Sequence, residues 1–150
     1  MVNDVEFMRA AYEEAYEGYQ SGGVPVGAVL VENGEIVGRG FNKRVQEDDP
    51  ISHGEMDCLR NAGRREDYSK TTIYTTLSPC MMCTGAIIQF GIKRVVIGEN
   101  VNFKGNIETL QQHGVDVTLL NDSDCTELMS KFVEEKPELW FEDIAGREDV

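Results

Sequence analysis

Four residues combine side-chain types and spacing that could support metal chemistry: His53, Glu55, Cys80 and Cys83. The two cysteines are three positions apart, at the expected start of a helix, so their side chains lie on one face. The positive end of that helix favours thiolates, which are the form that binds metal. Nitrogen and sulfur ligands together favour zinc over a harder cation. We therefore predict that His53, Cys80 and Cys83 bind one zinc ion per chain.

Three protein ligands would leave one zinc position open, which is typical of catalytic rather than structural zinc. A structural site would need a fourth ligand from Cys58, Cys125 or His113. Cys58 lies within an expected helix, Cys125 begins another, and His113 lies in a polar stretch. On these residues alone both kinds of zinc site stay open. A redox pair of cysteines is a third alternative, but it explains neither His53 nor Glu55.

Glu55 favours catalysis when it is considered together with the three ligands. Residues two apart in the middle of a helix do not share a face. At a helix start, however, side chains lean back past the N-terminus, so Glu55 could reach water at the metal and transfer protons. Taken alone, Glu55 would be a surface glutamate favoured by the helix dipole.

Alternating strands and helices are expected to position these residues. Periodicity predicts helices at residues 4–20, 53–62, 79–91, 123–135 and 137–144, and strands at 24–31, 35–40, 71–77, 94–98 and 116–120. Asn33-Gly34 is a strong hairpin signal, because both turn residues must adopt positive φ. The pattern implies a layered α/β domain that begins with an antiparallel hairpin. We expect residues 1–150 to form one domain.

The composition restricts the partners of this chain. Its 27 Asp and Glu residues against 14 Lys and Arg give a formal net charge of −13. Nucleic-acid binders usually present a basic face, so the charge argues for a small substrate and against a nucleic-acid partner. No apolar run is long enough to cross a bilayer, and the first residues lack the features of a signal peptide. We expect a cytoplasmic protein with no membrane partner.

His-x-Glu with Pro-Cys-x-x-Cys, present here as residues 53–55 and 79–83, is the signature of zinc-dependent nucleobase deaminases. Nearly the whole chain resembles the yeast-type cytosine deaminases, within the cytidine deaminase-like superfamily. The resemblance is carried by residues 11–15, 22–25, 74–80, 83–88, 98–104 and 140–144. It implies a three-layer α/β/α fold with a central five-stranded mixed sheet, a homodimer, and hydrolysis of free cytosine to uracil and ammonia.

The same resemblance implies a set of substrate-binding residues. Asn42 and the Gly54 amide would bind the O2 edge of the pyrimidine. Asp143, assisted by the Ser78 carbonyl, would accept a hydrogen bond from the exocyclic amine. Glu55 would move the protons of the reaction.

Apolar contacts to the ring are implied by the same likeness. Phe103 and Trp140 would close over the base, and Val26 and Leu77 would complete the walls.

Departures from the family pattern keep several substrates open. They include Phe41 beside Asn42, Met56-Asp57-Cys58 after Glu55, and Met81. Isocytosine, 5-methylcytosine and guanine remain alternatives to cytosine, and a tRNA adenosine conflicts with the net charge. A non-catalytic zinc-binding module is the alternative outside the enzyme class.

Overall fold

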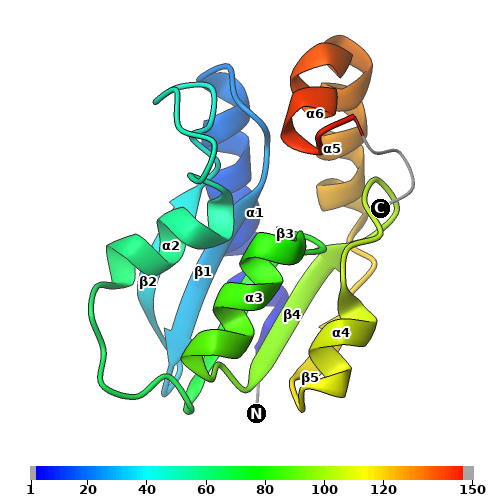
Figure 1. Ribbon diagram of the computed structural model, residues 1–150. Coiled ribbons are helices and arrows are strands. Elements are labelled where there is room, and N and C mark those ends of the chain that lie inside the picture. Colours follow the sequence, from blue (N-terminus) through cyan, green and yellow to red (C-terminus); the bar gives the residue numbers. More distant parts are fainter. Residues whose placement is uncertain (1–2, 147–150) are drawn as a thin grey trace.

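Five strands form one mixed sheet in the computed structural model, which describes residues 3–146 (Figure 1). They are β1 (Gly27–Glu32), β2 (Glu35–Phe41), β3 (Thr71–Leu77), β4 (Arg94–Glu99) and β5 (Asp116–Leu119), in the order β2-β1-β3-β4-β5. β1 is antiparallel to β2 and β3, whereas β3, β4 and β5 are parallel. The turn residues Asn33 and Gly34 have φ of 52° and 76°, which confirms the predicted hairpin.

Helices cover both faces of the sheet, which confirms the three-layer α/β/α arrangement (Figure 1). One face packs against α1 (Asp4–Gln20) and α5 (Ser123–Glu135), and the other against α2 (Gly54–Ala62), α3 (Met81–Phe90) and α4 (Ile107–Gln112). Side chains alternate between these layers: Ala28 and Leu30 face α2 and α3, whereas Val29 and Val31 face α1. None of the described helices is both long and apolar enough to span a membrane.

Two local expectations were wrong, and one helix was not predicted. The first strand starts at Gly27 instead of 24, because Val26 N donates to Val24 O at 2.9 Å and this turn keeps residues 24–26 out of the ladder. Pro79 does not open α3, since Cys80 is the N-cap residue and the helix begins at Met81. Helix α4 was not predicted, and Leu110 is the one residue that this short helix buries, so it shows no apolar periodicity.

A third apolar cluster lies where β3 and β4 end. It joins the segment before β1, the ends of these strands, α5 and the last helix, α6 (Pro137–Asp143), and comprises Val24, Val26, Leu77, Phe103, Met129, Phe132 and Trp140. In open α/β sheets, ligands bind at the carboxyl ends of the parallel strands. This cluster therefore forms the apolar side of the expected site.

Candidate active site

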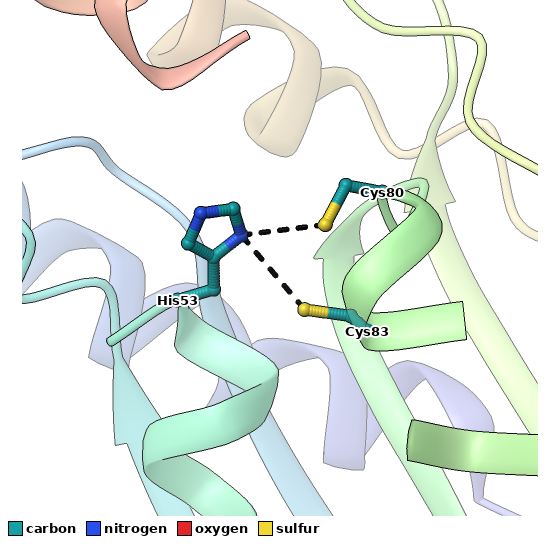
Figure 2. Close-up of side chains that lie close together, drawn as sticks. All are labelled: His53, Cys80 and Cys83. Carbon is teal, nitrogen blue, oxygen red and sulfur yellow. Dashed lines mark hydrogen bonds between the residues drawn. The ribbon is translucent and has the colours of Figure 1, made fainter. Parts of the chain in front are cut away.

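His53, Cys80 and Cys83 meet where two helices begin. His53 is the N-cap residue of α2, Cys80 is that of α3, and Cys83 lies in the first turn of α3. Figure 2 shows both sulfurs facing the same ring nitrogen. His53 Nδ1 lies 3.5 Å from Cys80 Sγ and 3.8 Å from Cys83 Sγ.

This arrangement fits a tetrahedral zinc ion. Zinc–sulfur bonds of about 2.3 Å and zinc–nitrogen bonds of about 2.05 Å place neighbouring ligand atoms about 3.6 Å apart. The observed separations bracket that value. Among residues 3–146, no other group of histidines, cysteines and acids gathers in this way. The donor set is therefore suited to one zinc ion.

The residues considered as a fourth ligand lie elsewhere. Cys58 is buried in the apolar layer under α2, and Cys125 is buried on the opposite face of the sheet. The His113 ring is within hydrogen-bond distance of Thr109 O, at 2.9 Å, and is exposed. The described part of the chain thus offers three ligands and leaves one coordination position for water or substrate.

Burial and neighbouring side chains shift the pKa values of the three ligand residues. A hydrogen bond with the Cys83 side chain, opposed by burial and assisted by His53, lowers the pKa of Cys80 to about 4. The same bond, with burial, raises the pKa of Cys83. Burial favours neutral His53, but Cys80 and Asp143 outweigh it and raise the pKa of His53 to about 9. Zinc takes thiolates and neutral imidazole, so its binding releases protons here.

Glu55 lies beside the ligand group, and its side chain is almost fully buried. Burial raises the pKa of Glu55 to about 7, with a further rise from negative Cys80 and an opposing effect of His53. A carboxyl group that titrates near neutrality can both accept and return a proton. The helix position predicted for Glu55 is confirmed, since it is the second residue of α2.

A cavity of about 520 Å³ opens beside these residues. Ten of the twelve predicted site residues line it: Val26, Asn42, His53, Glu55, Leu77, Ser78, Cys80, Phe103, Trp140 and Asp143. Gly54 and Cys83 do not line it. Cys83 is buried behind Cys80, and a Cβ on Gly54 would lie 2.6 Å from Val26 O, so glycine lets α2 begin this close to β1.

The polar wall of the cavity is built around Asn42 and Asp143. Asn42 is 1% exposed, its N donates to Val26 O at 2.9 Å, and its Oδ1 accepts from Arg44 N at 2.9 Å. Asp143 Oδ1 is buried without a hydrogen-bond partner and lies 3.4 Å from His53 Nε2. Burial raises the pKa of Asp143, whereas His53 and Arg44 oppose the rise. An unpaired carboxylate oxygen at this place can accept a hydrogen bond from a ligand.

The apolar wall is closed by two rings. Phe103 and Trp140 pack edge to face, with centroids 5.9 Å apart at 86°. Trp140 belongs to α6 and Phe103 to the segment after β4, so the two come from distant parts of the chain.

Several residues at the site were missed. The lining also contains Pro50, Met81, Met82, Lys104, Gly105, Asn106, Ile144 and Ala145. Residues 104–106 directly follow Phe103, and that adjacency was an available signal. Arg44, which pairs with Glu142 Oε1 at 2.5 Å and lies 3.8 Å from Asp143 Oδ1, carried no signal in the sequence.

Comparisons with known proteins agree with a zinc-dependent deaminase fold. The family model for the cytidine and deoxycytidylate deaminase zinc-binding region matches residues 1–99, and the chain belongs to this family. A cytosine deaminase of Candida albicans is 49% identical over 145 residues, covering 95% of this chain and 97% of that protein.

Other similar proteins are described by their names or titles as tRNA deaminases. A tRNA-specific adenosine deaminase of Streptococcus pyogenes serotype M1 is 35% identical over 138 residues, covering 84% of this chain and 81% of that protein. A solved structure from a study of tRNA:A34 deaminases superposes with a TM-score of 0.74 and 29% identity, covering 83% of this chain and 99% of that one.

Proposed function

We propose that this protein is a zinc-dependent cytosine deaminase that converts free cytosine to uracil and ammonia. The observation that carries the proposal is the cavity in which Glu55, Asn42 and Asp143 surround the space beside the zinc ligands, with Asp143 Oδ1 buried and without a hydrogen-bond partner. The 49% identity to the Candida albicans enzyme, over almost the full length of both chains, supports the same substrate.

The chemistry divides between the metal and the chain. Zinc, held by His53, Cys80 and Cys83, would supply a Lewis acid that makes water nucleophilic near neutral pH. Glu55 would accept a proton from the attacking water and deliver it to N3 of the ring, which makes C4 more electrophilic. Glu55 would then take the second proton, from the new C4 hydroxyl, and pass it to the amine as the C4–N bond breaks, so that ammonia leaves and the C4 carbonyl of uracil forms.

Recognition of the base would come from the polar wall. Asp143 Oδ1 would accept from the exocyclic amine, with the Ser78 carbonyl beside it. The Asn42 side chain and the Gly54 amide would bind the O2 edge. The Asn42 Oδ1 atom already accepts from Arg44 N, which fixes the orientation of the amide and directs its NH₂ donors elsewhere.

Closure over the base would come from the apolar wall. Phe103 and Trp140 would cover the ring, and Val26 and Leu77 would pack against it. These four side chains belong to one apolar cluster, and each is at most 7% exposed. Their burial supports a role in excluding water from the reacting base.

Two other functions have weaker support. The relatives named as tRNA deaminases favour a tRNA substrate, but the net charge of −13 opposes binding to a polyanion. A non-catalytic zinc module would need a fourth protein ligand, and the described residues bring none to the group.

The direct test is ammonia release from cytosine, 5-methylcytosine, isocytosine, guanine and adenine by the zinc-loaded protein. We expect cytosine to give the highest kcat/KM. In Glu55→Gln we expect loss of about 100-fold or more with unchanged zinc content, and Glu134→Gln, an exposed glutamate on α5, is the matched control. Retained activity in E55Q would refute the role of Glu55, and ammonia from another base alone would reject cytosine as substrate.

We also propose that the protein forms a homodimer in the cytoplasm. Helix α3 supports the dimer because it exposes Met81 (62%) and Phe90 (44%) at its two ends. The four cysteines are unpaired, and a thiolate zinc site suits a reducing compartment. Light scattering should give twice the chain mass of 16.8 kDa, and Phe90→Lys should shift it toward one. A monomeric wild type at micromolar concentration would reject the dimer.

A further inference from the structure

Asp57 is a buried acid that does not line the cavity. It lies in α2, two residues after Glu55, and its side chain is 4% exposed. Neither the zinc group nor the proposed reaction uses it. A carboxylate this deeply buried needs partners to offset its lost hydration, so its contacts indicate what it does.

One oxygen of Asp57 contacts both residues that flank Asn42. Asp57 Oδ2 accepts from Phe41 N at 3.1 Å and lies 3.1 Å from Lys43 Nζ. Asp57 Oδ1 lies 3.5 Å from Nη1 of Arg60, whose side chain is half exposed. Lys43 is also stacked on the Phe41 ring, with Nζ 4.8 Å from the centroid.

These contacts join the helix of the proton-transfer residue to the segment of the base-recognition residue. Asn42 follows directly after β2, and its own backbone N is held by Val26 O on β1's side of the site. Asp57 adds a second link, through the backbone amide of Phe41 and the side chain of Lys43, the residues before and after Asn42. The distance between Asn42 and Glu55 thereby depends on the Asp57 carboxylate.

We propose that Asp57 is a positioning residue for substrate recognition, which holds Asn42 in register with Glu55 through Phe41 and Lys43. The proposal rests on the proposed function, because it assigns Asn42 to the base. It adds a determinant of base binding outside the cavity. Asp57 acts through Asn42 and touches neither substrate nor metal.

The test measures binding separately from turnover. Trp140 is the sole tryptophan and lines the cavity, so its fluorescence reports cytosine binding. In the Glu55→Gln background cytosine is consumed about 100-fold or more slowly, so its Kd can be measured before it is converted. Asp57→Ala removes the acceptor of a charge-assisted hydrogen bond, and we expect the Kd to rise about tenfold with zinc content unchanged.

A double-mutant cycle distinguishes positioning from a general loss of structure. If Asp57 acts through Asn42, Asp57→Ala changes the Kd less than about twofold once Asn42→Ala is present. Asp57→Asn with Lys43→Met keeps an acceptor for Phe41 N and removes the Lys43 charge, while the half-exposed Arg60 stays solvated, so this double variant should bind within about threefold of the parent.

Asp4→Ala is the matched control for the loss of a partly buried acid. Asp4 pairs with Arg94 at 2.7 Å, at the start of β4 and away from the cavity. We expect this variant to lower the melting temperature without changing the Kd. The proposal is overturned if D57A raises the Kd equally in the parent and in the Asn42→Ala variant. It is also overturned if D57A does not raise the Kd at all.

Failure of the proposed function would look different. In that case the E55Q parent itself binds no cytosine, and the side-chain amide resonance of Asn42 becomes the readout. A shifted resonance in D57A then supports positioning by Asp57, and an unmoved one refutes it.

Discussion

Gly40→Ala is the substitution that most directly tests how the hairpin is docked on α2. A Cβ on Gly40 would lie 2.6 Å from the backbone N of Cys58 and 2.5 Å from Asp57 Oδ2. Ordinary van der Waals contact begins at 3.4 Å, so the strand and the helix must separate by about 0.8 Å. A helix backbone cannot yield as a side chain would, and the end of β2 is therefore expected to move.

In Gly40→Ala, we expect the displaced end of β2 to move Asn42, which lies two residues further along the chain. Overpacking of this kind costs about 1–3 kcal/mol of stability. Misplacement of a catalytic contact by about 1 Å can cost about 100-fold in rate. We therefore expect G40A to lower kcat/KM for cytosine by about 100-fold while the protein stays folded and keeps its zinc.

Gly38→Ala is the matched control on the same strand. Its Cβ would lie 2.6 Å from the Cβ of Ala62, the last residue of α2, and 2.9 Å from Cys58 O, and neither residue lines the cavity. We expect a similar loss of stability by urea denaturation, but kcat/KM within about threefold of wild type. Equal kcat/KM in G38A and G40A would refute the coupling between the docked strand and the site.

Three further substitutions test the ligands, the charges and the loop. Cys83→Ser removes a sulfur ligand, and atomic absorption should find less than about half a zinc per chain; full occupancy would contradict the ligand set. The hydrogen bond from Arg94 lowers the pKa of Asp4, so Asp4 stabilises the fold above its unfolded pKa and loses this effect as pH falls through the folded value. By urea denaturation, the free energy of unfolding of Asp4→Asn should be about 1 kcal/mol lower than that of wild type near neutral pH. The two values should be equal near pH ~2. Gly105→Ala places a methyl group against Ser78 Oγ at a φ of 70°, and should raise KM several-fold in the ammonia assay; an unchanged KM would show that the loop adapts.

Local signals in the sequence predicted much of the fold. The Asn33-Gly34 turn pairs Glu32 with Glu35 in the first hairpin, and residues 123–135 form a helix with the predicted bounds. Their signals are local, since they lie in turn geometry and in apolar spacing within one segment. Helix α4 escaped prediction because it is six residues long and buries Leu110 alone.

The residues of the candidate site likewise divide into those that a local motif predicts and those that depend on distant packing. His53, Glu55, Cys80 and Cys83 were predicted because their spacing is itself the motif. Asp57 was named as a departure from the family pattern but was given no role, because a lone acid in a helix is usually solvated and only its contacts with β2 reveal its burial. Such contacts depend on the packing of segments distant in sequence, which no local pattern encodes.

Strand direction explains why the remaining residues converge. β1 is antiparallel to both β2 and β3, so β2 and β3 run the same way and end at the same edge of the sheet. Asn42 follows β2 and Ser78 follows β3, while Val26 precedes β1 at that edge. Phe103 follows β4, which is parallel to β3. The opening hairpin is therefore required by the site: it returns the chain to the edge where the parallel strands deliver the cysteines, and it places the proposed base-recognition residue opposite them.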